Sequence, residues 1–260
     1  MSSLVEPRFP LDLEREIFET AAILRPKIIP RLLLVAQRVH TWLEPMLYRV
    51  VSLTDGVDPV LPSFGRKPPD FLRDTIRHVF LDIDVTTAAA QAVLEVATET
   101  QSLALLSFNP NFDFESLAEP LGKLSKVQRL AIHKLTLPMY PSLTHLDLFQ
   151  LPHDFIVSLW PQIARFPALT HLAIPCDSEL AVAEHILSTC ETIHVLISMS
   201  QQGTQTHVDE AILLDHDRFL TMGVGNEEYK RDWEIGVRGG VDFWARVDQF
   251  VAKKLGEIVL

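Results

Sequence analysis

Apolar residues recur at fixed positions through the middle of the chain. The stretch Pro-x-Leu-Thr-His-Leu begins at Pro141 and begins again at Pro167. In both copies, apolar residues fill the first, fourth and sixth positions of a segment that starts at Leu143 or Leu169. Four further segments with the same spacing start at Ile76, Leu103, Val127 and Ile193. We interpret each segment as a short strand with its apolar side chains in a core.

The intervals between these strands carry helical periodicity. Apolar residues at helical spacing predict helices over 87–97, 154–166 and 179–190. The L-x-x-L-x-L spacing, with a period of about 26 residues, resembles that of leucine-rich repeats. This resemblance predicts an α/β fold over residues 76–225: an irregular leucine-rich-repeat-like solenoid, in which a parallel sheet has helices on its outer side.

The flanking segments have other patterns. Residues 1–53 predict three helical segments, over 11–22, 32–39 and 42–48, followed by a short strand over 50–53. Residues 54–75 are rich in Pro and Gly, which predicts a linker. Residues 226–260 contain one apolar helical face over 242–255, which we interpret as a C-terminal cap helix for the repeat array.

The N-terminal segment resembles an F-box, in the divergent form of mushroom-forming fungi. The resemblance rests on Phe9-Pro10-Leu11-Asp12-Leu13-Glu14 with Ile17-Phe18, on Leu33-Leu34-Val35-Ala36-Gln37-Arg38, and on Pro45-Met46-Leu47-Tyr48-Arg49. It implies a small helical domain that binds the adaptor protein of an SCF-type cullin-RING ubiquitin ligase. The residues that it places at the adaptor contact are Pro10, Leu11, Leu13, Ile17, Leu34 and Val35.

Composition narrows the functional classes. The hydrophobic content of 47% supports a folded core, and the formal net charge of −11 argues against binding to nucleic acid. Residues 1–53 carry seven Lys/Arg and six Asp/Glu, a net charge of +1, so the net negative charge lies in the rest of the chain. The start of the sequence lacks a secretory pattern, and we expect a cytoplasmic or nuclear protein without a membrane partner.

The predicted strands place polar residues on the side of the sheet that faces away from the helices. This predicted open face contains His78, Phe80, Arg129, His145, Asp147 and His171. Adjacent parallel strands lie about 4.8 Å apart, so His145 and His171 should be near neighbours, with Arg129 beside them. A protein-binding surface is the favoured interpretation, and a solvated face without a partner is an alternative.

Three functional hypotheses remain. The first is a substrate-recognition subunit of the ligase, with an unknown protein substrate bound by the repeats. The second is a repeat scaffold outside any ligase, in which the N-terminal helices only cap the array. The third is a metal-dependent hydrolase built on His145, His171 and Asp147. The glycine-containing stretches lack the features of phosphate-binding loops, and we expect neither a cofactor nor an enzyme.

Overall fold

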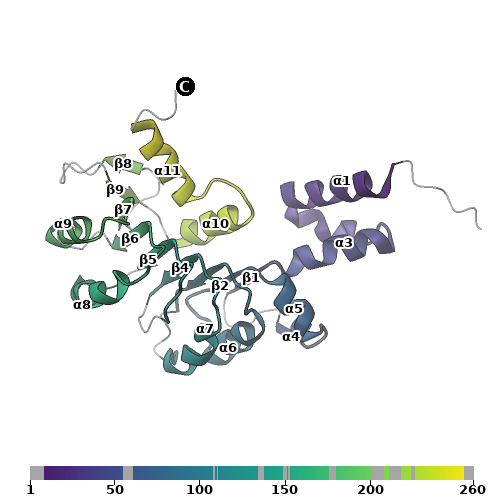
Figure 1. Cartoon of the computed structure of the whole chain (residues 1–260). Helices are drawn as coiled ribbons and strands as arrows, with labels where there is room; N and C mark the ends of the chain where they lie inside the picture. The colour runs from purple at the N-terminus through teal and green to yellow at the C-terminus, as the bar shows by residue number, and fades with distance from the viewer. Residues whose placement is uncertain are drawn as a thin grey trace, which may run out of the picture. The chain divides into compact units, whose positions relative to one another are not determined.

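The computed structural model describes residues 9–54, 61–107, 109, 111–133, 138–148, 151, 153–175, 180–200, 208–210, 218–223 and 226–254. The chain forms two compact units, residues 1–50 and residues 51–260. No helix in these described ranges is both long enough and apolar enough to cross a membrane. Figure 1 shows the elements of both units.

The N-terminal unit is a small helical domain with a core of its own. Its elements are α1 (Leu11–Leu24), η1 (Pro26–Ile28), α2 (Ile29–Leu32) and α3 (Gln37–Tyr48). The core contains Ala22, Ile29, Val39 and Leu43, with Phe18 and Trp42 among the side chains packed against it. The guanidinium of Arg38 donates two hydrogen bonds to Glu14, at 3.0 and 2.7 Å, and so ties α3 to α1.

Two boundaries of this unit differ from the sequence prediction. The second helix ends at Leu32 instead of continuing to residue 39, and residues 37–48 form the single helix α3. Pro45 lies inside α3 and does not interrupt it. Burial of Val39 and Leu43 on the inner side of α3 favours a continuous helix despite the hydrogen bond that proline removes.

The second unit is built on one sheet. Its strands are β1 (Val50–Leu53), β2 (His78–Leu81), β3 (Ser102–Leu105), β4 (Arg129–Ile132), β5 (His145–Leu148), β6 (His171–Pro175), β7 (Val195–Ser200), β8 (Val208–Glu210) and β9 (Phe219–Gly223). Their order in the sheet is β1-β2-β3-β4-β5-β6-β7-β9-β8. The strands β1 to β7 and β9 run parallel, whereas β8 pairs antiparallel with β9. The prediction of an α/β fold with a parallel sheet is confirmed.

The register places the predicted strand positions side by side. Leu130, Leu146, Leu172 and Leu196 occupy one row across β4 to β7. The predicted start at Leu103 is wrong, because Leu103 pairs with Val79 and Leu130 and therefore fills the fourth position of its segment. The repeat segment that contains β3 therefore starts three residues before Leu103. The equivalent first position is Thr100, a buried polar residue that the apolar pattern could not select.

Helices cover the face of the sheet to which the leucine rows belong. They include α6 (Thr87–Val96), η2 (Glu115–Leu117), α7 (Ala118–Gly122), α8 (His153–Ile163) and α9 (Leu180–Thr189), as Figure 1 shows. Three of these helices confirm the predicted segments 87–97, 154–166 and 179–190 to within a few residues. The side chains of Leu103, Leu146 and Leu172 are fully buried, and each contributes about 1.5–3 kcal/mol to folding.

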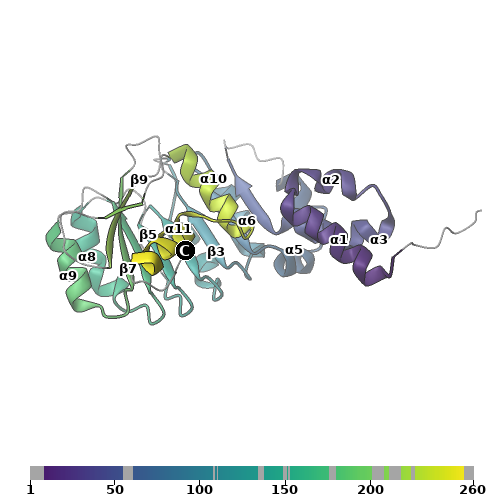
Figure 2. The same cartoon turned by 90° about the horizontal axis from the view of Figure 1, so that it is seen from above.

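Two further helices lie across the opposite face. These are α10 (Asn226–Val237) and α11 (Phe243–Lys254), which Figures 1 and 2 show over the strands. The sequence predicted one helix here, capping the end of the array. The structure corrects both points, since there are two helices and their apolar residues, including Phe243 and Trp244, pack against the sheet face.

The segment 54–75 also differs from its prediction as a linker. It contains α4 (Leu61–Phe64) and α5 (Pro69–Thr75). Pro69 occupies the first turn of α5, where its missing N–H costs no helical hydrogen bond. Leu72 of α5 is buried, so this part of the Pro-rich segment belongs to the folded core.

Candidate functional site

The six residues predicted on the open face lie in the expected rows. His78, Arg129, His145 and His171 share one row, and Phe80 and Asp147 share the next. The prediction that this face is open is wrong. Phe80 is only 1% exposed, against Trp233 of α10, and Asp147 is only 3% exposed, against Tyr229 of the same helix. Parallel sheets are commonly covered on both faces, and the apolar residues Phe80, Ala131 and Ala173 in this row are consistent with such a cover.

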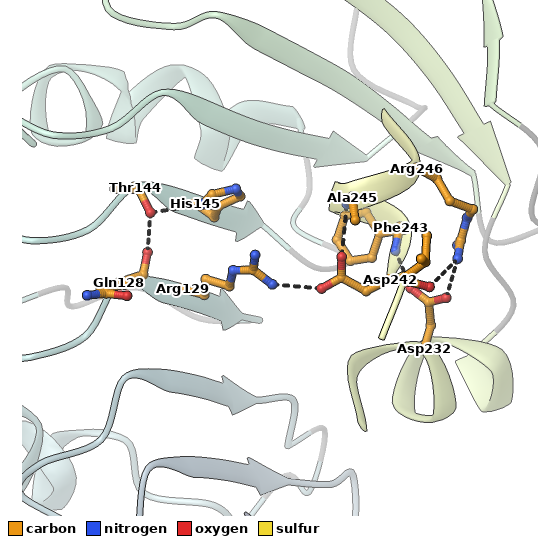
Figure 3. A network of polar contacts seen from close by, with 10 residues as sticks. Gln128, Arg129, Thr144, His145, Asp232, Asp242, Phe243, Ala245 and Arg246 are labelled. Carbon is orange, nitrogen blue, oxygen red and sulfur yellow. Dashed lines mark hydrogen bonds and ion pairs between the residues drawn. The ribbon is translucent and has the colours of Figure 1, made fainter. Parts of the chain in front are cut away.

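Arg129 connects the sheet to the start of α11. Its Nη1 donates a hydrogen bond to Oδ2 of Asp242 at 2.7 Å, as Figure 3 shows. The other carboxylate oxygen of Asp242 accepts a hydrogen bond from the backbone N–H of Ala245 at 2.9 Å. Asp242 therefore caps the N-terminus of α11 and forms an ion pair with β4 through the same carboxylate.

Asp232 joins α10 to α11 in the same region. It accepts a hydrogen bond from the backbone N–H of Phe243 at 2.6 Å and another from Arg246 at 2.7 Å (Figure 3). Burial raises the pKa of Asp232 above its ordinary value, and the bond from Arg246 acts in the opposite direction. These contacts orient the two helices as one pair over the sheet.

His145 and His171 form a stacked pair beneath α11. Their ring centroids are 4.2 Å apart, and their planes differ by 10°. Trp244 lies at roughly right angles to both rings, with centroid distances of 5.0 Å to His145 and 5.7 Å to His171. The repeat of Leu-Thr-His-Leu produces this geometry, since His145 and His171 pair directly in the register of β5 and β6.

Each histidine is held by the threonine that precedes it. Thr144 Oγ1 lies 2.8 Å from Nδ1 of His145, and Thr170 Oγ1 lies 2.7 Å from Nδ1 of His171. Both hydroxyl groups donate to a backbone carbonyl oxygen of the preceding strand segment, as Figure 3 shows for Thr144 and Gln128. The repeated Thr-His pair therefore gives the two rings the same orientation.

Charge in this cluster is unevenly distributed. Burial, together with the neighbouring His171 and Arg129, lowers the pKa of His145 to about 3. Nε2 of His171 lies 2.9 Å from Oδ1 of Asp248 on α11, and this bond lowers the pKa of Asp248. His145 is therefore neutral near pH 7, whereas the Asp248 carboxylate is charged.

Asp147 lies deeper than the histidines and has a different partner. Its carboxyl group is hydrogen-bonded to Tyr229 of α10, and its Oδ2 atom is buried without a partner among the described residues. Burial raises the pKa of Asp147 to about 7 and raises that of Tyr229 as well. The adjoining cavity has a volume of about 20 Å³, which has room for about one water molecule and no substrate.

These contacts change the predicted metal patch. The carboxylate that lies near the two histidines is that of Asp248, not that of Asp147. Ligand atoms of His145, His171 and Asp248 all lie within 4.8 Å of one another. The sequence pattern did not predict roles for four residues of this region: Asp248, Asp242, Asp232 and Tyr229. The apolar face of residues 242–255 indicated a helix that packs against another part of the chain. The sequence of this segment alone did not indicate where that helix would lie.

The residues predicted to contact an adaptor lie on the surface of the N-terminal unit. Leu34 is 86% exposed, although it is a large apolar side chain. The other five are also exposed: Pro10, Leu11, Leu13, Ile17 and Val35. An exposed group of this kind in a small domain is typical of an interaction site.

Helix α1 separates its apolar residues between two sides. Phe18 and Ala22 pack in the core of the unit. Leu13, Ile17 and Leu24 follow one another at helical spacing on the opposite side, where all three are exposed. Thus α1 is apolar both toward its own core and toward its surface, which its internal packing does not require.

No protein-family model matches the chain, and neither a curated protein nor a solved structure does so.

Proposed function

We propose that the chain is an interaction protein whose N-terminal unit binds the adaptor of an SCF-type cullin-RING ubiquitin ligase, so that the chain serves as a substrate-recognition subunit. The observation that carries this proposal is the exposure of Leu11, Leu13, Ile17, Leu34 and Val35 on a helical unit with its own core. The F-box resemblance of residues 9–50 supplies the identity of the partner.

The finer interpretation of the second unit belongs to the same proposal. We infer that residues 76–225 are irregular leucine-rich-repeat-like units. The neighbouring order of β2 to β7 and the aligned rows of leucines support this inference. A sheet of stacked units suits a recognition subunit, because such proteins bind partners over extended surfaces.

The face that contains His145 and His171 is not the substrate-binding surface in this proposal, because α10 and α11 cover it. The exposed apolar residues of the N-terminal unit carry adaptor binding independently of that face. Binding of the adaptor and binding of a substrate are therefore separable in experiments.

A co-purification experiment tests the proposal. The full chain and the double variant Leu11→Ala/Leu34→Ala are each mixed with purified ligase adaptor. A matched control, Met139→Ala/Val241→Ala, removes two exposed apolar side chains from the second unit. We expect the original chain and the control to retain the adaptor and the first variant to lose it. A folded chain that does not bind the adaptor at micromolar concentration contradicts the proposal.

A further inference from the structure

We propose that His145, His171 and Asp248 bind a divalent metal ion of the zinc type, held between the sheet and α11. This inference does not depend on ligase function. The three residues come from β5, β6 and α11, and their ligand atoms all lie within 4.8 Å of one another. Imidazole nitrogen with carboxylate oxygen is a ligand set suited to zinc, whereas calcium and magnesium prefer sites made of oxygen alone.

The threonine contacts determine which ring nitrogen is available. The hydroxyl of Thr144 donates to the carbonyl of Gln128 at 3.0 Å, and its oxygen accepts from His145 in the tautomer with hydrogen on Nδ1. The same arrangement repeats at His171, where Thr170 donates to the carbonyl of Thr144 at 3.3 Å. In the tautomer with hydrogen on Nδ1, the Nε2 atom of each ring is the ligand atom for the ion. Outer contacts of this kind orient the histidine ligands of metal sites.

The contact between His171 and Asp248 is a position where a metal ion can replace a hydrogen atom. At 2.9 Å, Nε2 donates a hydrogen bond to the carboxylate when it carries hydrogen, and a metal ion bound at this position displaces that hydrogen. Either a proton or a metal ion fills this position. A metal ion gains the additional lone pair of His145, which a proton shared with Asp248 does not use.

The surroundings accommodate the added charge. Arg129 is the cation on the neighbouring strand, and Asp242 holds its guanidinium at 2.7 Å. The ring of Trp244 packs nearly perpendicular to both imidazoles and leaves Asp248, with 52% of its side chain exposed, as the route for entry. Zinc bonds of about 2.0–2.2 Å place ligand atoms about 3.3 Å apart, so binding draws the three side chains together by rotation.

The site would fix α11 on the sheet. Two ligands belong to the sheet and the third to the covering helix, so the ion joins elements that are otherwise held by Arg129 and by apolar packing. Three protein ligands leave a coordination position for water in a tetrahedral site. We expect zinc to raise the melting temperature of the chain and magnesium to leave it unchanged.

Calorimetric titration tests the proposal on the full chain, freed of metal by a chelator and dialysed. Zinc chloride is added to the original chain, to His171→Gln and to Asp248→Asn. His194→Gln is the matched control, since it removes an exposed histidine beside the neighbouring strand β7. Circular dichroism verifies folding, and Asp248→Asn is decisive because its side chain is half exposed.

We expect one zinc ion per chain, at least a tenfold loss of affinity in His171→Gln and Asp248→Asn, and unchanged affinity in His194→Gln. Cobalt should give the visible absorption bands of a four-coordinate site in the original chain and not in Asp248→Asn. Absence of zinc binding at low micromolar concentration overturns the proposal. So does equal affinity in Asp248→Asn, or a tenfold loss in the control.

Discussion

Arg129 and Asp242 form an ion pair of 2.7 Å between β4 and α11, 113 residues apart in sequence. The Asp242 carboxylate is nearly buried, and the Arg129 side chain is 37% exposed. Because the carboxylate also caps α11, the pair determines where this helix begins on the sheet. It is the polar counterpart of the apolar contacts made by Phe243 and Trp244.

Replacing Arg129 and Asp242 singly and together should reveal the interaction free energy between their side chains. We expect Asp242→Ala to lower the free energy of unfolding by about 2 kcal/mol, since it removes both a helix cap and the partner of Arg129. Arg129→Ala should cost less, because it leaves the helix cap in place and solvent screens the ion pair at the partly exposed guanidinium. Urea unfolding of both single variants and of the double variant measures the coupling, which we expect near 1 kcal/mol. Strictly additive losses would show that the ion pair is not formed in solution.

Asp147 should give the chain a distinctive pH dependence. Its pKa is about 7 in the folded chain and about 3.8 in the unfolded chain. The stability that this group contributes is fully present below pH 3.8 and is lost as the pH rises through 7. The full difference is on the order of 4 kcal/mol.

Asp147→Asn isolates that contribution, because other groups titrate equally in both proteins. His145 has a lowered pKa and acts in the opposite direction, gaining stability as the pH rises from about 3 to 6.5. The original chain should lose stability relative to Asp147→Asn between pH 4 and pH 7, measured by urea unfolding across that range. If the difference in free energy of unfolding between the two proteins stays constant from pH 4 to pH 7, the Asp147 carboxyl does not have a raised pKa.

Gly236 tests the approach of α10 to Asp242. A Cβ atom at this position would collide with the Asp242 carboxylate, so Gly236→Ala should displace the carboxylate from Arg129. We expect a loss of about 1–3 kcal/mol in the free energy of unfolding. Gly122→Ala is the control, because its Cβ would meet no other atom within 4 Å. Equal stability of the two variants would argue against this close approach.

The N-terminal unit provides a pair of leucines with opposite environments. Leu43 is fully buried in the core of the unit, whereas Leu34 is 86% exposed. Leu43→Ala should cost about 2–5 kcal/mol within this unit, and Leu34→Ala should cost almost nothing. Hydrogen exchange of peptides from residues 11–48, measured by mass spectrometry, distinguishes them. Faster exchange in Leu34→Ala would place that side chain in the core.

Repetition made much of the second unit predictable. The spacing around Leu146 and Leu172 predicted strands β5 and β6, and the shared Thr-His pair correctly predicted that His145 and His171 are neighbours. The misplaced start at Leu103 has a physical cause. A buried Thr100 replaces the apolar residue at the first position, and its hydroxyl is satisfied by the carbonyl of Ala97 at 2.6 Å.

The cover on the sheet could not be predicted from local pattern. The face of α11 that includes Phe243 and Trp244 predicted a helix, but an amphipathic helix can pack at an array end or across a sheet. Contacts distant in sequence decide between these positions, including Arg129 with Asp242 and His171 with Asp248. The exposed set around Leu34 was accessible to sequence reasoning only through the family resemblance.

A calorimetric titration of the full chain with purified ligase adaptor tests adaptor binding directly. We expect a one-to-one complex of micromolar affinity or tighter. We also expect at least tenfold weaker binding for Leu13→Ala/Ile17→Ala, whose side chains lie exposed on α1, and no change for Met139→Ala/Val241→Ala. Absence of heat and of complex at these concentrations, with the chain folded, would contradict the proposed adaptor binding.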